Sequence, residues 1–320
     1  MKLINGSWFE FQHHNKPEGK YWNPICRRFS KEQWQEKLRE MASLGMEYVV
    51  LMHTSLVYED YAESYFDSGI YDRPKDFGCA DPIGAMLEEA DRLGLKVFLS
   101  TGFYGVWNQN NKNMYDPEVL KRAFAASEKV FVLYGQHTSF YGWYFPEEAL
   151  ILSYFSDYFI DYVNRFSAFV HSLDQKYKTM IAPFGTCLVN ADDKYVAQLE
   201  RMDIDFIAYQ DEVGVKKVKA KETAAIFEAL KKVHDKAGRA RLWADIEIFK
   251  FERYLYNSAL LPAGIKRIKI QLENVTPYVD EVLCYQYFGI MNQPGSIAYC
   301  GHPDSIQFYE DYKALVEEMR

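Results

Sequence analysis

The stretch FYGWYFPEEAL, residues 140–150, is an aromatic run that Pro146 stops, and Glu147 and Glu148 follow at once. A short run that is apolar on both faces is typical of a strand buried in a parallel sheet. Two carboxylates at the end of such a strand have two explanations. Either they occupy the first turn of the next helix, where the helix dipole favours acids, or they do chemistry.

Runs of this kind alternate with helical patterns along the whole chain. Seven further apolar, β-rich runs lie at residues 3–11, 47–54, 95–103, 178–185, 205–211, 241–249 and 281–289. The helical patterns lie at residues 30–45, 81–94, 116–135, 153–173, 192–202, 219–237 and 262–275, and from about residue 303. Eight strand–helix pairs predict an α/β fold, the (β/α)₈ TIM barrel. Because no Pro/Gly/Ser-rich linker divides the chain, we expect residues 1–320 to form a single domain.

The boundaries of the helical patterns carry recognisable signals. Ser30 is placed to cap the first helix, and Asp81 precedes a proline at the start of the second, which ends at Gly94. Connections from helix to strand are short, whereas those from strand to helix are long, above all at residues 12–29 and 55–80. In a TIM barrel the active site lies on the strand-to-helix side. A doubly wound sheet is the alternative, but a dinucleotide-binding glycine pattern is missing after the first run.

The charge balance narrows the class of partner. With 37 basic and 45 acidic residues, the net charge is −8 and no basic tract occurs, so we expect neither nucleic acid nor an anionic membrane surface as a partner. The N-terminus lacks the apolar core of a signal peptide. We therefore expect a cytoplasmic protein, or a periplasmic one if a leader has been removed. The five cysteines are scattered without a CxxC pair, which predicts free thiols.

Polar residues at the carboxyl ends of the predicted strands are the candidates for function. Glu247 is the hardest to explain as structural, because it lies inside the apolar run LWADIEIF, where an unpaired acid is costly. Strand alternation places Glu247 on the same side as Trp243 and Asp245. The other strand-end candidates are Glu10, His53, Glu148 and Asp211. For each acid taken alone, a position in the first turn of a helix is an equally good explanation.

The strands that carry Glu148, Asp211 and Glu247 are close neighbours in a barrel, so we expect these acids to converge on one cleft. Glycoside hydrolysis needs two such carboxyls, one protonated to donate to the leaving oxygen and one ionised. The abundant aromatics, 17% of the residues, fit the same substrate class, since the C–H faces of sugars stack on aromatic rings. The aromatic candidates for substrate binding are Tyr104, Trp107, Tyr144, Tyr209, Trp243 and Tyr285. The alternative is that half of these rings fill the barrel core.

Three motifs, GWYFPEE (142–148), YQDEVG (209–214) and LWADIEIF (242–249), resemble those of DUF4434, a bacterial family of glycoside-hydrolase-like TIM barrels common in gut Bacteroidetes. The resemblance covers roughly residues 3–300. The family pattern, W-Y-x-P-x-E, Q-D-x-V-G and W-x-x-x-E-x-F, is filled here by Trp143, Tyr144, Pro146, Glu148, Gln210, Asp211, Val213, Gly214, Trp243, Glu247 and Phe249. It implies that Glu148 is the functional acid, a choice over Glu147 that spacing alone leaves open. Gln210 joins the candidates for substrate binding on the same ground.

The arrangement is also similar to a broader clan of retaining glycosidases, in which the acid/base follows the fourth strand and the nucleophile follows the seventh. This resemblance implies that Glu148 is the acid/base and Glu247 the nucleophile. The chain departs from the clan at position 147, where Glu replaces the usual Asn. The mechanism therefore stays open, because Asp211 is either a third, positioning carboxylate or the base of an inverting pair.

These observations favour a retaining glycoside hydrolase that acts on a glycan or oligosaccharide without a cofactor or metal. A carbohydrate-binding barrel without turnover is one alternative, since the aromatics suffice for binding. A metal-dependent hydrolase is another, with His13, His14 and His53 near the first two strand ends. Adjacent histidines on an extended segment point to opposite sides, so His13 and His14 are a poor chelating pair. Nothing in the sequence selects a sugar, a linkage or an oligomeric state.

Overall fold

The computed structural model describes residues 1–319, which contain a closed barrel of eight parallel strands. In chain order the strands are β1 (Gly6–Phe9), β2 (Tyr48–Leu51), β5 (Lys96–Ser100), β6 (Phe140–Tyr144), β7 (Lys178–Ile181), β8 (Phe206–Gln210), β9 (Arg241–Glu247) and β12 (Val282–Tyr285). The barrel closes where β1 pairs with β12, with Gly6 opposite Leu283. The predicted TIM-barrel architecture is confirmed.

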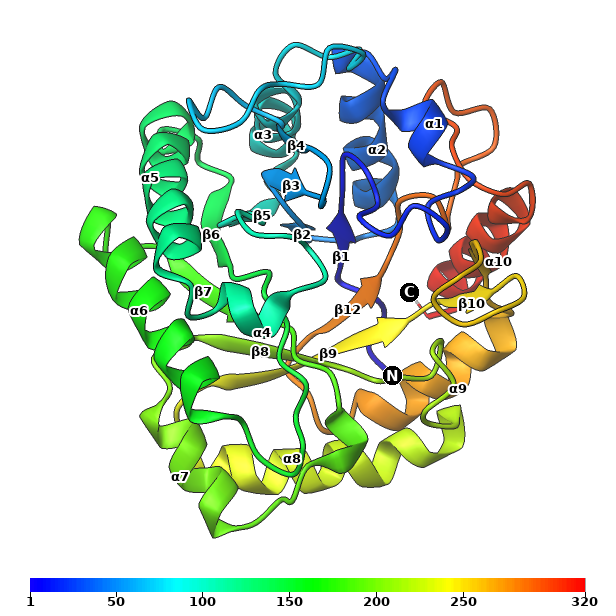
Figure 1. Cartoon of the computed structure of the whole chain (residues 1–320). Helices are drawn as coiled ribbons and strands as arrows, with labels where there is room; N and C mark the ends of the chain where they lie inside the picture. The colour runs from blue at the N-terminus through cyan, green and yellow to red at the C-terminus, as the bar shows by residue number, and fades with distance from the viewer. Residues whose placement is uncertain (320) are drawn as a thin grey trace.

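A helix follows each barrel strand and lies on the outside of the barrel (Figure 1). These helices are α2 (Lys31–Ser43), α3 (Pro82–Leu93), α5 (Pro117–Tyr134), α6 (Asp157–Leu173), α7 (Asp193–Arg201), α8 (Thr223–Ala237), α9 (Ile265–Val275) and α10 (Asp304–Met319). Ser30 caps α2 as expected, and α3 ends at Gly94, whose φ of +70° favours glycine. The helix predicted from residue 153 begins only at Asp157, because residues before it form isolated bridges instead.

Aromatic side chains fill the barrel interior near the amino ends of the strands. The ring of Trp243 packs against Phe206 and Tyr48, with centroids 4.4 and 4.9 Å apart, and Phe98 lies beside them at 6.2 Å. All four side chains are buried. Because this end is filled, room for a ligand remains only toward the carboxyl ends of the strands, as is general for this fold.

Several strand-to-helix loops contain short elements of their own, which build up the carboxyl end of the barrel. These elements are α1 (Asn23–Cys26), the hairpin β3 (Ser55–Val57) with β4 (Ala62–Ser64), α4 (Asn110–Asn113), and the hairpin β10 (Phe249–Phe251) with β11 (Leu260–Pro262). Two short 3₁₀ turns, Thr186–Leu188 and Ala220–Glu222, precede α7 and α8. The helix-to-strand turns on the other end carry no such additions within residues 1–319, so the two ends of the barrel differ.

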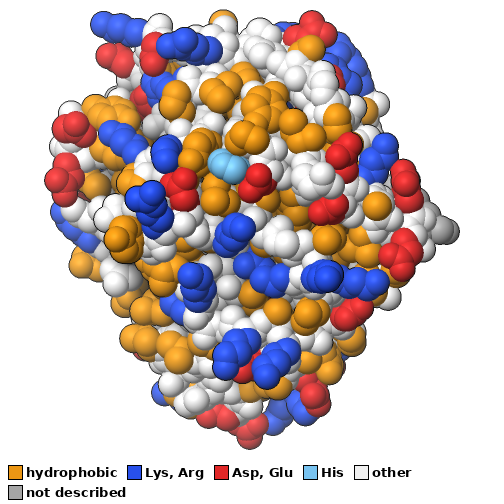
Figure 2. Space-filling model, turned by 90° about the vertical axis from the view of Figure 1, so that its right-hand side faces the viewer, with side chains coloured by type: hydrophobic (Ala, Val, Ile, Leu, Met, Phe, Trp, Pro, Cys, Tyr) orange, Lys and Arg blue, Asp and Glu red, His pale blue; other side chains and the backbone are white. Residues whose placement is uncertain are grey.

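The outer surface carries mixed charge. On the face shown in Figure 2, acidic and basic side chains are interspersed with hydrophobic ones. Across residues 1–319, no helix combines the length and the apolar character needed to cross a membrane. The five cysteines are free thiols, as their spacing predicts, and all except Cys187 are buried.

Candidate active site

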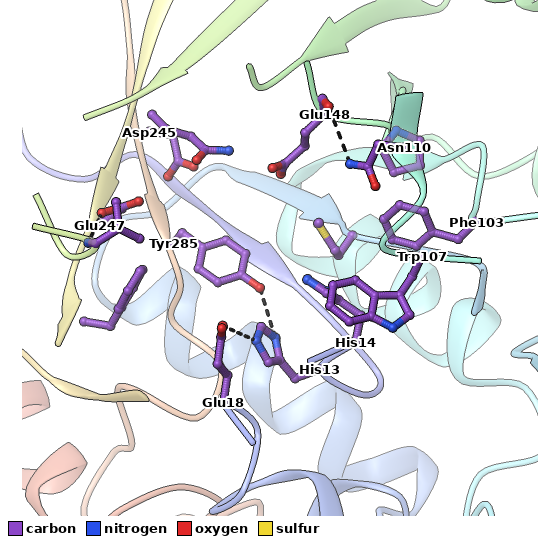
Figure 3. Close-up of a pocket in the computed structure, with 15 residues that line it drawn as sticks. His13, His14, Glu18, Phe103, Trp107, Asn110, Glu148, Asp245, Glu247 and Tyr285 are labelled. Carbon is purple, nitrogen blue, oxygen red and sulfur yellow. Dashed lines mark hydrogen bonds and ion pairs between the residues drawn. The ribbon is translucent and has the colours of Figure 1, made fainter. Parts of the chain in front are cut away.

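A cavity of about 190 Å³ lies at the carboxyl ends of the barrel strands, on the strand-to-helix side where the sequence predicts the site. Its walls come from the loops after β1, β5, β6 and β8 and from the ends of β9 and β12 (Figure 3). Three acids on one side of the cavity face two histidines and a fourth acid on the other side. These residues are Glu148, Asp245, Glu247, His13, His14 and Glu18. Segments far apart in the sequence therefore meet in one polar cavity.

Glu148 reaches this cavity from the loop after β6. It is half-buried, whereas the neighbouring Glu147 is almost wholly buried and does not line the cavity. Burial raises the pKa of Glu148 to about 7, although Gln210 and Tyr144 beside it act in the opposite direction. A carboxyl with a pKa near 7 can hold a proton at neutral pH, as a general acid must.

Glu247 is the last residue of β9 and lines a different wall of the cavity. Its Oε2 accepts the backbone N–H of Val215 at 2.8 Å. The loop after β8 fits closely here, because a Cβ at Gly214 would lie 2.9 Å from the Cβ of Glu247. Burial and then the negative charge of Asp211 raise the pKa of Glu247. The hydrogen bond from Val215 opposes this shift, since it favours the ionised carboxylate.

Asp211 does not line the cavity, although the sequence predicts it beside the substrate. It is buried, and its carboxylate accepts the backbone N–H groups of Val213 at 3.2 Å and Glu247 at 3.1 Å. Gln271 on α9 donates to the other oxygen at 2.6 Å. The strand β8 ends at Gln210, and Asp211 directly after it still lies against β9, since its backbone N–H donates to the carbonyl of Asp245 at 2.9 Å. Asp211 is therefore placed to hold Glu247, not a ligand.

Asp245 is a cavity residue that the predicted site leaves out. It is 2% exposed, and its Oδ1 has no hydrogen-bond partner among residues 1–319. Burial, followed by the charges of Glu247, Asp211 and Glu148, raises its pKa well above the usual value. The signal for this residue was present in the sequence, because strand alternation places it on the same side of β9 as Glu247.

Glu10, His13 and Glu18 form a chain of charges on the opposite wall. His13 Nδ1 lies 3.0 Å from Glu10 Oε2, and His13 Nε2 lies 3.0 Å from Glu18 Oε2. Burial opposes a charge on His13, but the two carboxylates outweigh it and raise the His13 pKa to about 10. Burial likewise opposes a charge on Glu10, yet His13 brings the Glu10 pKa down to about 2. His13 is thus a cation held between two anions.

The prediction that His13 and His14 point to opposite sides is wrong. Both line the cavity with ring centroids 4.7 Å apart, because the loop after β1 bends at these residues and is not extended. Ligand atoms of Glu10, His13 and His14 lie within 4.8 Å of one another, a donor set that suits a divalent cation. However, both ring nitrogens of His13 already face carboxylates at 3.0 Å. An ion would have to displace one of these partners and the proton, so the geometry fits an ion-paired histidine better.

Three of the predicted substrate-binding residues line the cavity, namely Trp107, Gln210 and Tyr285. Tyr285 also lies against the charged chain, with its Oη 3.1 Å from His13 Nδ1. Trp107 is half-buried, and its ring lies 4.8 Å from that of His14. These two rings therefore give the cavity aromatic surface beside its two histidines.

The other predicted binding residues lie outside the cavity, each for a local reason. Tyr209 points outward from β8, where its hydroxyl meets Tyr195 and His234, because Gln210 takes the inward position. Trp243 is on the cavity side of β9 but four residues before its end, so it belongs to the aromatic core. The remaining four are fully buried around the cavity and do not line it: Glu10, His53, Tyr104 and Tyr144.

The barrel and its acidic, aromatic cavity define a TIM-barrel protein with glycoside-hydrolase-like architecture. The chain belongs to the DUF4434 family, described as a domain of unknown function, whose family model matches residues 4–298. The resemblance seen in the sequence is therefore confirmed. No curated protein matches the chain at a significant level.

Solved structures similar to this one are barrels of carbohydrate-active enzymes. A candidate α-L-fucosidase from Bacteroides thetaiotaomicron superimposes with a TM-score of 0.74 at 17% identity, covering 98% of this chain and 93% of that one. An endo-1,4-β-D-mannanase from Thermotoga petrophila superimposes with a TM-score of 0.59 at 12% identity, covering 98% of this chain and 100% of that one. An endo-1,4-β-mannanase from Rhizomucor miehei superimposes with a TM-score of 0.60 at 10% identity, covering 99% of this chain and 95% of that one. At such identities the likeness extends to the fold.

Proposed function

We propose that this protein is a retaining glycoside hydrolase that acts on a glycan or oligosaccharide, with Glu148 as the acid/base and Glu247 as the nucleophile. The observation that carries the proposal is that these two carboxyls, from the ends of β6 and β9, face one cavity, and that the pKa of Glu148 is about 7. The fold shared with structures named as a fucosidase and mannanases supports this class of reaction.

In the first step, an oxygen of the Glu247 carboxylate attacks the anomeric carbon of the sugar in the cavity. The bond from that carbon to the glycosidic oxygen breaks, and the oxygen takes the proton of Glu148. In the second step, Glu148 removes a proton from water, whose oxygen attacks the same carbon and releases Glu247. The enzyme returns to its starting state, and one water has been consumed for each bond broken.

The remaining residues of the cavity would bind and orient the sugar. Trp107 and Tyr285 offer ring faces for its C–H groups. Burial raises the pKa of Asp245 well above its usual value, and its Oδ1 has no partner among residues 1–319, so this carboxyl is free to hydrogen-bond with a sugar hydroxyl. The His13 cation adds a positive charge to the wall opposite these acids.

The test replaces each proposed catalytic carboxyl by its amide and measures turnover on a panel of disaccharides and aryl glycosides of fucose, mannose and galactose. Glu148→Gln and Glu247→Gln should each lower kcat/KM by roughly 10²–10⁴-fold. Glu147→Gln is the matched control, because Glu147 is the adjacent acid but does not line the cavity. Unchanged activity in either of the first two variants would contradict the assignment, as would equal losses in all three.

A carbohydrate-binding barrel without turnover is the second candidate. The observation that favours it is the raised pKa of Glu247, because a protonated carboxyl is a poor nucleophile. In that case the wild-type protein binds members of the panel without hydrolysing any of them, and Glu247→Gln leaves the affinity within about threefold of the wild-type value.

A further inference from the structure

A second and larger cavity adjoins the first and shares two of its residues, Glu148 and Asn110. It measures about 540 Å³ and is lined chiefly by the segment of residues 108–112 around α4, together with Tyr115, Leu150 and Phe184. The acids Asp245 and Glu247 line the first cavity and not this one. Glu148 therefore stands between two spaces that differ in chemistry.

We propose that this second cavity is the subsite for the leaving group of the reaction, and that the leaving group is itself a sugar. The inference rests on the proposed function. A general acid protonates the glycosidic oxygen, which joins the transferred sugar to the group that leaves, so these two units lie on either side of it. The transferred sugar lies with Glu247, which attacks it, in the first cavity. The second cavity remains for the other unit.

The sizes of the two cavities agree with this division. The first, at about 190 Å³, is smaller than the roughly 300–1,000 Å³ typical of pockets for drug-sized ligands, and so suits one sugar ring. The second, at about 540 Å³, has room for at least one further unit. The substrate that fits both spaces is an oligosaccharide, not a glycoside of a small alcohol.

The lining of the second cavity suits a neutral ligand rich in hydroxyl groups. Four consecutive side chains, residues 108–111, carry amides, and each amide both donates and accepts, as a sugar hydroxyl does. Glu148 is neutral while it holds its acid proton, so Lys112 brings a single positive charge to the residues that line this cavity. The ring of Tyr115 is 60% exposed and offers a face against which C–H groups can pack.

This segment is held in place by contacts of its own. Tyr158 on α6 donates from its hydroxyl to Asn111 Oδ1 at 3.1 Å, and its ring meets Tyr115 edge-on with centroids 6.3 Å apart. Asn113 donates from Nδ2 to the carbonyl of Val106 at 3.0 Å, which closes the turn around α4. Because these side chains are already ordered, a ligand loses less of its binding energy to ordering them.

The experiment compares a disaccharide with the glycosyl fluoride of the same transferred sugar, which needs no leaving-group subsite. The probes are disaccharides and fluorides of fucose, mannose and galactose, and the variants are Asn111→Ala and Tyr115→Ala. Each variant should lower kcat/KM on the disaccharide about tenfold more than on the fluoride, the loss expected for one contact. Tyr254→Ala, at a 73% exposed tyrosine that lines neither cavity, should leave this ratio unchanged. Equal losses on both substrates overturn the inference.

A failure of the proposed function gives a different result. If the wild-type protein hydrolyses no probe, calorimetric titration with the same disaccharides and their monosaccharides tests the subsite by itself. A disaccharide that binds about tenfold more tightly than the monosaccharide, with the difference removed by Tyr115→Ala, supports the subsite without turnover. Equal affinities, or no binding of any probe, overturn it.

Discussion

Asp211 Oδ1 accepts the backbone N–H of Glu247 at 3.1 Å, so one buried acid holds the strand end that carries another. Gln271 ties the same point to α9, donating to Asp211 Oδ2 at 2.6 Å and to the Glu247 carbonyl at 3.2 Å. The negative charge of Asp211 also raises the pKa of Glu247. An acid that contacts no ligand can therefore set both the position and the proton affinity of the acid that does.

Asp211→Asn tests this positioning role. We expect kcat to fall roughly tenfold to hundredfold through misplacement of Glu247, with KM changed much less. Removal of the negative charge should also lower the pKa of Glu247, so the acidic limb of the pH–rate profile should move to lower pH. Steady-state kinetics across pH 4–9 and thermal unfolding of the variant measure both effects. A uniform loss of activity with an unmoved acidic limb would mean that Asp211 serves only the stability of the fold.

The pH dependence of the wild-type enzyme follows from the two raised pKa values. Activity needs an ionised Glu247 and a protonated Glu148. Because the pKa of Glu247 is raised to about 8, above the value of about 7 for Glu148, the required pair of protonation states is most populated between about pH 7 and 8, and kcat/KM should fall on acidification below about pH 7. On the alkaline side it should fall as Glu148 loses the proton that its pKa of about 7 retains. A profile that stays at its maximum down to pH 5 would contradict the raised pKa of Glu247.

Much of the fold follows from the sequence, because each strand and helix carries its own local pattern. The acid pair after β6 and Glu247 on β9 could be located for the same reason, since each lies at the end of one strand. The choice of Glu148 over Glu147 needed the family pattern as well. The alternation of side chains along β8 and β9 also predicts that Gln210 and Asp245 point into the barrel. Tyr209 precedes Gln210 by one residue, so the same alternation points its ring away from the cavity, and its aromatic character does not make it a binding residue.

The path of the loop after β1 could not be predicted from the local sequence patterns. His13 faces the cavity because the chain bends there and because Glu10 and Glu18, before and after it, converge on its two ring nitrogens. That geometry depends on the path of the whole loop and on Tyr285 from the last barrel strand. No spacing rule for a single strand or helix predicts such a path, so the prediction for this histidine pair failed.

Lys37→Met tests a buried ion pair away from both cavities. Lys37 Nζ lies 2.9 Å from Glu40 Oε2 and donates to Asn292 Oδ1 at 2.7 Å, and both charged side chains are 0% exposed. The substitution leaves the Glu40 charge buried without its cation, which should lower the free energy of unfolding by about 3–5 kcal/mol. Lys31→Met is the matched control, since Lys31 pairs with Glu88 at the surface, and it should cost at most about 1 kcal/mol. Denaturant unfolding measures the free energy lost in each variant. Similar losses in the two variants would contradict the larger contribution of the buried pair.

His13→Gln should change how stability depends on pH. The folded pKa of Glu10 is about 2 against 4.5, so its stabilisation is present above pH 4.5 and is lost as pH falls toward 2. The folded pKa of His13 is about 10 against 6.5, so its stabilisation is full below pH 6.5 and is lost as pH rises toward 10. The pair therefore contributes most between about pH 4.5 and 6.5.

Denaturant unfolding at pH 5.5 and pH 9 measures this contribution. Between these two pH values, the difference in free energy of unfolding between the wild type and His13→Gln should shrink by roughly 2–4 kcal/mol. Glu10→Gln should show a smaller loss than the wild type, because His13 then lacks its main partner. If the free energies of unfolding of the wild type and His13→Gln change equally with pH, His13 is not held as a cation.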